Sequence, residues 1–533
     1  LMFGLSYNNR EGINQADREI SAAATTCNLN GCFLNGSTTT GDGTFTLNAA
    51  QASNATLRNY FTSRGVPLDA IFSGQRVGFN TNGSMFIAGS TNQVNPNDRV
   101  WLYTSGYQAE GNYDPNRALL YNFNPENLLQ SPFERYSFFT NLDYDINDHV
   151  ELYGSALYAT YDALNQLASS PAGFTVSLTG PAATSFINPD ARAALVAATT
   201  SGSIGLSRRT VEFGPRIFDN TTDAWQLTGG VRGDFDVRGN NWRWDFNTSY
   251  GSYHNSEEQR GYPHLVRINA ALNGCPAGSP LGPVGPSGAP TACVPFNPFG
   301  YGNITQPQIN YIEAKAQVRE TNIVMQTAQA SITGDAFDIW AGPVAFAAGV
   351  EYRSLDYSNI PGEAQQTGAL LGANSAGPVN GSFDVAEAFG ELRIPLLAEM
   401  PFVEYLGIEA GYRYSDYANS AGNSFATDTW KLGAEWEPTD YLRFRVQAQQ
   451  AVRAPSVGEL FTTRATGFPS VGTTVDPCNF NSAQRTGANA TQVRALCAAQ
   501  SAAIANDPNW RSAGAQFRTV SGGNPNLDPE TAT

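Results

Sequence analysis

The sequence has few charged residues and almost no lysine. Of its 533 residues 15% are charged, against about 25% in soluble globular proteins, and Lys315 and Lys431 are the only lysines. Asp and Glu (47) exceed Lys and Arg (31), which gives a formal net charge of −16. A nucleic-acid partner needs a basic surface, so we expect none.

Long apolar runs are also missing. The mean hydropathy is −0.30, and no stretch of about 18 apolar residues occurs, which excludes a helical membrane bundle. A hydrophobic content of 41% is too high for a disordered chain. What is abundant is glycine (52) and aromatic residues (30 Phe, 23 Tyr and 8 Trp), and together these features favour a β-protein.

Histidine is scarce, and no Cys-x-x-Cys occurs, which argues against zinc. The six cysteines instead fall into three local pairs, Cys27/Cys32, Cys275/Cys293 and Cys478/Cys497. We expect three disulfides, although six cysteines allow 15 connectivities, and disulfides indicate an oxidising compartment. A set formed by His254, Glu257, Glu258 and His264 matches no helical zinc motif. We therefore expect neither a metal nor another cofactor.

The N-terminus lacks the basic and apolar regions of a leader peptide. An exported protein needs one, so we expect either that a leader has been removed or that the sequence is a window of a longer protein.

The main positive signal is strict alternation of apolar and polar residues. From Trp225 to Val237 the odd positions are apolar or glycine and the even ones polar, and after a short turn the pattern resumes from Trp242 to Tyr250. Alternation with period two predicts a strand that is apolar on one face only. These two segments therefore predict a long antiparallel hairpin.

The same pattern recurs along the chain. We expect roughly fourteen such strands, many of 10–15 residues against a usual length of about five or six. Tight turns alternate with long loops, expected at about 11–70, 163–205, 256–320, 356–380 and 455–515. Short turns at one rim and long loops at the other are typical of an outer-membrane β-barrel, whose long loops are extracellular.

A soluble β-sandwich or β-helix would also show alternation. Strand length, the asymmetry of the connections and charges of both signs along the polar face argue against it. We therefore predict an all-β protein with a transmembrane antiparallel barrel and long extracellular loops, spanning residues 1–533.

Several motifs resemble one family. Ala451–Phe461 (AVRAPSVGELF) and Gly523–Thr531 (GNPNLDPET) resemble the strand-exit and strand-re-entry motifs of TonB-dependent outer-membrane receptors. Cys293–Gly300 (CVPFNPFG), Ser331–Asp335 and Glu387–Leu392 resemble further segments of a large subgroup, in the family's order. The motif residues are Arg453, Pro455, Ser456, Asn524, Pro525, Leu527, Pro529 and Glu530. Proline cannot donate to a ladder, so we expect mainly structural roles at the strand ends, with Arg453 able to bridge carboxylates there.

The resemblance implies a 22-stranded barrel filled by an N-terminal plug domain, and active import energised by the TonB complex through a short N-terminal box. It implies a Gram-negative outer membrane as the location and outer-membrane lipid as a neighbour. We find no plug, no energy-coupling box and no closing aromatic strand in this sequence. The expectation is therefore a central part of such a barrel, with roughly 14 of about 22 strands.

Charges of both signs on the polar face do not form the single-sign rings of an ion-selective pore. We expect them to line the lumen and to hold the plug domain through ion pairs, with these candidates: Arg135, Asp143, Asp234, Arg243, Asp245, Arg413, Arg443 and Arg445.

Aromatic residues in the long loops could stack on a ligand or pack the loops together. The ligand candidates are Tyr253, Phe296, Phe299, Tyr301 and Trp510. No nucleophile elbow or paired catalytic signature occurs, so we expect no enzyme.

The most consistent function is uptake of a scarce small or medium solute such as siderophore-bound iron, cobalamin or an oligosaccharide. A passive porin or adhesin barrel and a secreted β-rich carbohydrate-active enzyme are the alternatives.

Overall fold

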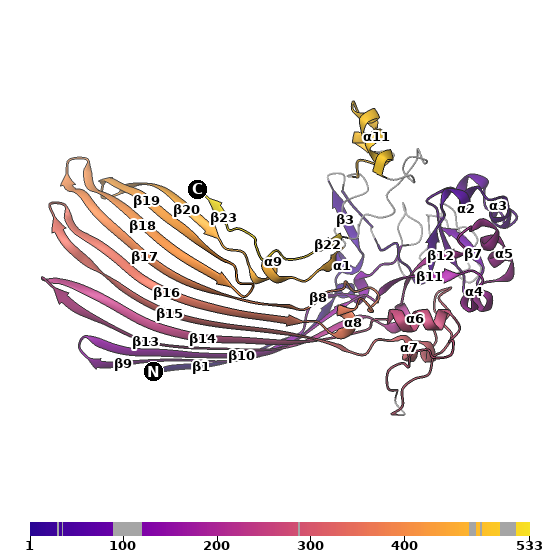
Figure 1. Cartoon of the computed structure of the whole chain (residues 1–533), viewed down its shortest axis with the longest axis horizontal. Helices are drawn as coiled ribbons and strands as arrows, with labels where there is room; N and C mark the ends of the chain where they lie inside the picture. Colours follow the sequence, from indigo (N-terminus) through magenta and orange to yellow (C-terminus); the bar gives the residue numbers. More distant parts are fainter. Residues whose placement is uncertain are drawn as a thin grey trace.

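The computed structural model describes residues 1–28, 31–34, 36–88, 120–285, 288–467, 476–479, 482–500 and 519–533, without the side chains of 26–28 and 31–34. In this part of the chain, twelve antiparallel strands form one large sheet in the order β1, β9, β10, β13 to β20 and β23 (Figure 1). Their bounds are Met2–Arg10 (β1), Phe133–Asn147 (β9), Val150–Leu167 (β10), Arg216–Val237 (β13), Asn240–Arg260 (β14), Gln317–Ile339 (β15), Gly342–Ile360 (β16), Val379–Met400 (β17), Val403–Asn419 (β18), Ser424–Thr439 (β19), Leu442–Arg453 (β20) and Glu530–Ala532 (β23).

One rim of this sheet consists of tight turns. Two residues separate each of the pairs β9/β10, β13/β14, β15/β16, β17/β18 and β19/β20. In the turn after β13, Arg238 and Gly239 both have positive φ (55° and 89°). Two consecutive residues with positive φ form the turn whose twist matches that of a hairpin. The predicted hairpin of residues 225–250 is therefore present, with Trp225 opposite Ser252 and Phe235 opposite Trp242.

The alternation separates the large sheet into two faces. We call the face that carries Arg232 the inner face and the face that carries Trp225 the outer face. Connections fold onto the inner face, because Arg319 of β15 donates to Gln365 of helix α8 (Glu363–Gln366) at 3.1 Å. The outer face carries exposed aromatic and aliphatic side chains, from Tyr136 on β9 to Phe444 on β20.

Glycine within the strands makes room for aromatic rings. A Cβ atom at Gly230 would lie 2.4 Å from Cζ of Tyr153, and one at Gly407 would lie 2.3 Å from the hydroxyl of Tyr405. The ring of each tyrosine therefore covers a glycine of the same face. This packing gives the glycines of the strands a structural role.

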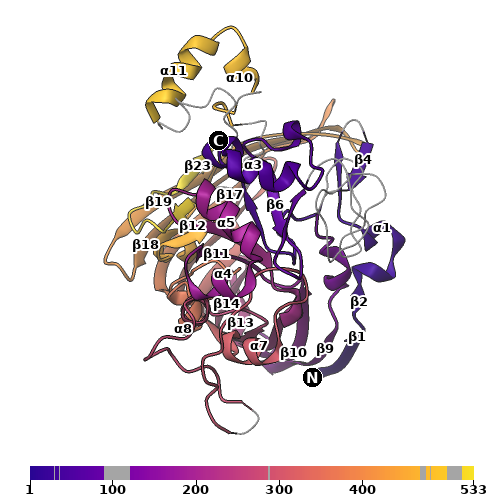
Figure 2. The same ribbon diagram turned by 90° about the vertical axis from the view of Figure 1, so that its right-hand side faces the viewer.

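The long connections are folded. Parts of 36–88, 168–215 and 261–316 form a unit that we call the cap, at the right-hand end of Figure 1 and in front in Figure 2. Its sheet has the order β11 (Pro171–Ser177), β12 (Ser203–Arg209), β5 (Thr44–Thr46), β6 (Arg76–Phe79) and β7 (Met85–Ala88). Its helices are α2 (Ala49–Ser53), α3 (Ala55–Thr62), α4 (Pro181–Phe186), α5 (Pro189–Ala198), α6 (Leu265–Leu272) and α7 (Gln306–Ile312).

Local sequence explains why the cap helices begin where they do. The side chain of Asn54 accepts a hydrogen bond from the amide of Leu57 at the start of α3. Asn188 does the same for Asp190 at the start of α5, where Pro189 follows. Asparagine at the N-cap and proline at the first helical position both favour helix initiation. The apolar sides of α3 and α5 are buried with Phe61 and Leu195 in the core of the cap.

The remaining elements are short. Two-stranded ladders join β2 (Ile13–Asn14) to β8 (Leu128–Gln130), β3 (Thr25–Asn28) to β4 (Gly31–Leu34) and β21 (Ala465–Gly467) to β22 (Thr519–Ser521). The other helices are α1 (Glu19–Ala22), α9 (Val457–Phe461), α10 (Ala483–Thr486) and α11 (Ala490–Gln500), with 3-10 turns at Gln15–Asp17, Leu68–Ala70, Asn124–Glu126 and Val211–Phe213. Helices α10 and α11 project from the body in both ribbon views.

The length of several strands differs from the sequence-based expectation. Strands β10, β14 and β16 continue to Leu167, Arg260 and Ile360, into segments that we expected to be loops. Beyond the apolar part of the sheet both faces are polar, so the alternation fades while the hydrogen-bond ladder continues. The expected count of roughly fourteen strands and closure into a barrel stay predictions, because the described residues give a sheet of twelve.

Among the helices of the described residues, none is both long and apolar enough to cross a bilayer.

Candidate functional site

The register places all eight lumen candidates on the inner face. Arg135 and Asp143 lie on β9, Asp234 on β13, and Arg243 and Asp245 on β14. The other three lie on β18 and β20: Arg413, Arg443 and Arg445. Inner-face residues of neighbouring strands lie opposite each other, and four of the eight form ion pairs across strands: Asp143, Arg413, Arg443 and Arg445. Asp234 contacts His149, and Asp245 accepts from a tyrosine.

The first network joins β9, β10, β13 and β14. Arg232 pairs with Glu151 at 2.7 Å and with Asp143 at 3.6 Å. The hydroxyl of Tyr153 donates to both carboxylate oxygens of Asp245, at 2.9 and 2.8 Å. A cavity of about 450 Å³ lies beside this network, and its lining includes five acidic residues together with Arg232, Arg243 and His149. His149 is 3.3 Å from Asp234.

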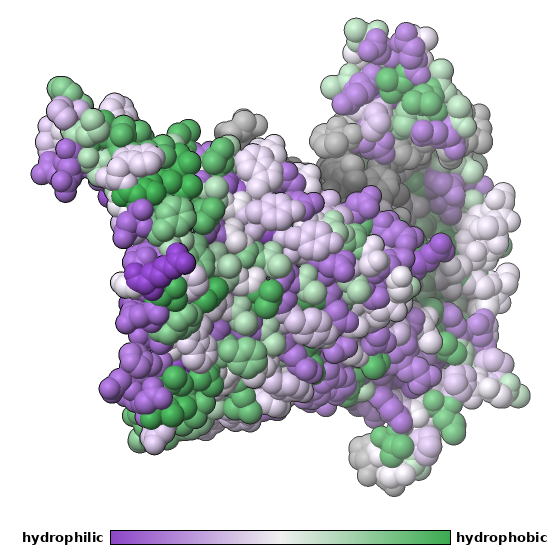
Figure 3. All heavy atoms as spheres, turned by 60° about the vertical axis from the view of Figure 1, so that its left-hand side comes forward, coloured by the Kyte–Doolittle hydropathy of each residue, from purple (hydrophilic) through white to green (hydrophobic). Residues whose placement is uncertain are grey.

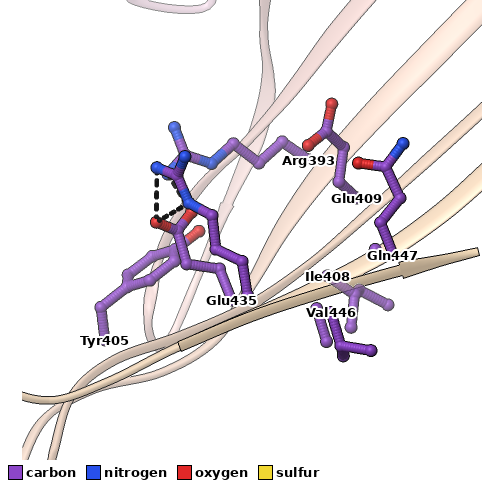
Figure 4. Close-up of a pocket in the computed structure, with 11 residues that line it drawn as sticks. Arg393, Tyr405, Ile408, Glu409, Glu435, Val446 and Gln447 are labelled. Carbon is purple, nitrogen blue, oxygen red and sulfur yellow. Dashed lines mark hydrogen bonds and ion pairs between the residues drawn. The ribbon is translucent and has the colours of Figure 1, made fainter. Parts of the chain in front are cut away.

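The second network lies near the tight turns of β17 to β20 (Figure 4). Glu435 accepts from Arg445 at 3.0 Å and from Arg393 at 3.5 Å (Figure 4). It also accepts from Arg443 at 2.9 Å. A cavity of about 330 Å³ opens beside Glu435 and is also lined by Tyr405, Glu409 and Gln447. Glu435 therefore holds three guanidinium groups together on the inner face.

Two further networks lie farther from the turns. Lys431 contacts Glu409 at 2.6 Å and Glu391 at 2.9 Å. Arg413 contacts Glu387 at 3.3 Å and Glu351 at 3.9 Å. The pairs of Lys431 are partly exposed, so each contributes at most about 1 kcal/mol to stability, whereas Glu387 is buried. The alternation of positive and negative side chains matters more, because a domain that packs against the inner face would meet charges of both signs.

The family motif residues form one clamp at the base of the long connection 454–529. Arg453 contacts Glu459 at 2.9 Å and Glu530 at 2.8 Å, so it ties the end of β20 to α9 and to β23. Ser456 caps α9 and accepts from the amide of Glu459, whose carboxylate in turn accepts from the amide of Ser456. The pKa of Glu459 is lowered to about 2, mainly by the hydrogen bond from Arg453 and secondly by the hydrogen bonds from Ser456.

The second half of the motif completes the clamp. The amide of Asn524 donates to the carbonyl of Glu459 at 2.8 Å, and the carbonyl of Pro525 accepts from Asn423 of the β18–β19 turn at 2.9 Å. Leu527 donates to Asn524 at 3.1 Å. Pro455 and Pro529 lie next to the ends of β20 and β23, where no ladder donor is needed. The two motifs, 70 positions apart, therefore meet in space.

The disulfide candidates have different outcomes. Cys275 pairs with Cys293 and Cys478 with Cys497, each with Cα atoms 5.6 Å apart. Cys27 and Cys32 are opposite each other in the β3–β4 ladder, but their side chains lie outside the described part of the chain. Each observed bond closes a local segment of a long connection.

The aromatic loop candidates do not form one site. Phe296 and Phe299 are fully buried in the cap, where Phe299 packs against Phe79 with ring centroids 4.7 Å apart. Buried rings of this kind hold loops together and are not accessible to a solute. Tyr301 is 44% exposed on the cap, Tyr253 lies half-buried on the inner face of β14, and Trp510 falls outside the described residues.

His254, Glu257 and Glu258, which we considered as metal ligands, form hydrogen bonds and ion pairs within the large sheet instead. His254 lies on the outer face, 2.7 Å from Asn322 and 3.4 Å from Glu320. Glu257 lies on the inner face and pairs with Arg319, and Glu258 pairs with Arg260. His264 is separate, at the start of α6. In the described residues, no three His, Cys, Asp or Glu side chains gather as a potential metal site.

Sequence reasoning missed a buried ion pair in the cap. Arg208 is fully buried, pairs with Glu212 and donates to the carbonyls of Pro298 and Gly300 at 2.9 and 2.7 Å. It therefore fixes the aromatic segment 296–300 to β12. The only signal in the sequence was an Arg-Arg pair that ends a short alternating strand. The carbonyl groups that Arg208 binds lie about 90 positions later.

Comparison with known proteins agrees with this architecture. The family described as TonB dependent receptor-like, beta-barrel matches residues 295–533, whereas no curated protein matches the chain. The matched part contains β15 to β20, β23 and both halves of the clamp. Strands β1, β9, β10, β13 and β14, which precede the match, continue the same sheet through the β14–β15 ladder. Residues 295–533 thus match the β-barrel of TonB-dependent receptors, a family of outer-membrane transport proteins.

Proposed function

We propose that this chain forms the wall of an active importer in a Gram-negative outer membrane. It takes up a scarce nutrient, such as siderophore-bound iron, cobalamin or an oligosaccharide, and the TonB complex supplies the energy. No bond of the solute is made or broken during transport. The inner-face ion pairs hold a plug domain, whose displacement opens a path along the inner face.

The observation that carries this proposal is the outer face of the large sheet. Exposed aromatic side chains lie there in two belts, one near the tight turns (Tyr144, Phe235, Phe246, Trp436 and Phe444) and one farther along the strands (Tyr158, Trp225, Tyr250, Tyr352, Tyr412 and Trp430). Trp225 and Phe235 are ten positions apart on β13, which corresponds to a height of about 25 Å for a tilted strand. An apolar band of that height between aromatic belts suits a bilayer.

The space-filling view supports the same interpretation. Figure 3 shows apolar residues gathered on the strands close to the tight turns, with hydrophilic residues around the turns themselves. Such a large exposed apolar surface does not suit contact with water. Because short turns lie on the periplasmic side in barrels of this type, the cap would face the outside of the cell.

Uptake measurements test the proposal. The full receptor would be produced in a Gram-negative host, and accumulation of labelled ferric siderophore, cyanocobalamin and oligosaccharide would be compared in cells with and without a functional TonB complex. We expect accumulation of one solute that stops when the complex is deleted. Equal uptake in both strains would instead indicate a passive porin and would refute active import.

A further inference from the structure

A neutral zone crosses the inner face between two layers of ion pairs. The upper layer is the pair Glu257–Arg319, at 3.4 Å, and the lower layer contains the pairs of Arg353 and Arg413 with Glu351 and Glu387. Strands β14 to β17 are fully described, and on them no inner-face residue between the two layers is charged.

Six of these neutral residues form what we call the aromatic zone: Tyr253, Ile323, Met325, Leu355, Tyr357 and Phe383. The register makes them neighbours, because Tyr253 is opposite Ile323 and Ile323 is opposite Tyr357. Met325, Leu355 and Phe383 form a second such row. None of the six belongs to the buried core, and all are half-exposed. The zone is therefore a surface of rings and aliphatic side chains in the middle of a charged wall.

The tyrosines of this zone have different surroundings from those on the outer face. Tyr352 and Tyr158 of the outer face donate to Asp384 and Asp223 at 2.7 and 2.8 Å. Tyr253, in contrast, lies against Tyr161 and near Tyr357, and no carboxylate lies on the inner face of β14 to β17 at this level. The phenol groups of the zone therefore have no carboxylate partner on the inner face of these four strands.

The zone also lies on the route that a solute would take. It is situated between the cap and the charged networks near the tight turns. Phe461 of α9 lies over Gly381, the residue opposite Tyr357, so the base of the connection 454–529 borders the zone. A solute moving along the inner face from the cap towards the turns must pass these rings.

We infer that the aromatic zone binds a neutral solute with stacking rings, that is, a carbohydrate or a phenolic glycoside. A charged chelate would lose hydration there and find no charged inner-face residue at that level of β14 to β17. A sugar or phenyl ring can stack on Tyr253 and Tyr357 while its hydroxyls bond to Asn255 and Thr321, the neutral polar neighbours. This inference rests on the proposed transport function and names the class of solute.

Calorimetric titration of the purified full receptor tests it. The probes are maltohexaose, the phenolic glucoside arbutin and a ferric tris-catecholate complex. We expect saturable binding of one of the two neutral probes, and about tenfold weaker binding after Tyr253→Ala or Tyr357→Ala. Tyr253→Phe, which keeps the ring, should bind almost as tightly as the native protein.

Tyr352→Ala is the matched control, because it removes a tyrosine from the outer face of the same strand as Tyr357. Heat-modifiable migration on gels verifies that each variant is folded. Binding of the ferric complex alone, or no binding of either neutral probe, would overturn the inference while leaving TonB-dependent uptake intact. Failure of the proposed function itself would appear separately, as uptake without TonB.

Discussion

At the scale of single residues, Arg453 connects three elements that the sequence separates widely. Its guanidinium contacts Glu459 on α9 and Glu530 on β23. All three side chains are exposed to solvent, so their value lies in positioning rather than in net stability. A bidentate guanidinium fixes geometry in a way that a lysine cannot.

Arg453→Gln should therefore release the clamp without unfolding the sheet. We expect faster hydrogen exchange in residues 455–461 and 530–532, together with a rise in the pKa of Glu459 from about 2 because its strongest partner is lost. Arg445→Gln is the matched control on the same strand, since Arg445 contacts Glu435 instead. Unchanged exchange at both ends of the connection would contradict the clamp.

His264, at the start of α6 in the cap, provides a pH-dependent contact. Its backbone amide donates to Ile312, and Leu265 donates to Ala369, so residues 262–265 join two connections. The pKa of His264 is lowered mainly by burial and secondly by the positive charge of the nearby Arg267, while Glu363 raises it. Because the folded pKa is lowered, His264 stabilises the fold above about pH 6.5, and this contribution is lost as the pH falls below that value.

We expect His264→Gln to remove this dependence. The free energy of local opening at Leu265, measured by hydrogen exchange between pH 5 and 7.5, should fall on acidification in the native protein and stay level in the variant. His149→Gln, at a turn where the side chain is 68% exposed, is the control. An identical pH profile in native protein and H264Q would refute the role of His264.

At the scale of elements, contacts between α9 and β17 depend on one glycine. A Cβ atom at Gly381 would lie 2.2 Å from a ring carbon of Phe461. Gly381→Ala should therefore displace α9 and cost about 1–3 kcal/mol of stability. Gly390→Ala on the same strand is the control, because the nearest atom to its added methyl group would be 4.0 Å away. Thermal unfolding followed by circular dichroism distinguishes the two, and equal midpoints would contradict close packing of α9.

The strands show how far local pattern predicts an element. Alternation predicted the hairpin of β13 and β14 and the faces of Arg243 and Asp245, because each side of a strand has a single environment. The cap was not predicted. Its strands have three to seven residues, and Thr44 of β5 pairs with Ser207 of β12. Short strands with partners so far away in sequence leave little periodic signal.

At the scale of the whole molecule, the inner face is charged near the tight turns, neutral in the aromatic zone and charged again at the pair Glu257–Arg319. The acidic cavity beside Arg232 and the arginine cluster around Glu435 lie on different strands of the same sheet. A plug domain that fits this surface needs basic groups facing β9 to β14. Such complementarity favours a single orientation of the two parts.

Replacing both Arg243 and Arg445 by alanine should weaken plug binding. Each lost pair contributes about 0.2–1 kcal/mol, so we expect affinity to fall by up to about thirtyfold for the double variant. Binding of the separately expressed plug domain to the full barrel region, measured by surface plasmon resonance at two salt concentrations, gives the readout. Lys431→Gln shows whether any inner-face charge has the same effect, and unchanged affinity in the double variant would refute the plug-holding role.

The sequence by itself determined the strands, the two-faced sheet, the pairs Cys275–Cys293 and Cys478–Cys497 and the resemblance to the receptor family, because each follows from residues within one segment. Tertiary structure decided what depends on distant partners. It brought Arg453 to Glu530, buried Phe296 and Phe299 in the cap, and aligned Tyr253 with Tyr357 through the ladder of β15. The small number of charged residues has a physical reason. On each strand one face is apolar, and on the other face the charges form paired layers with neutral rings between them.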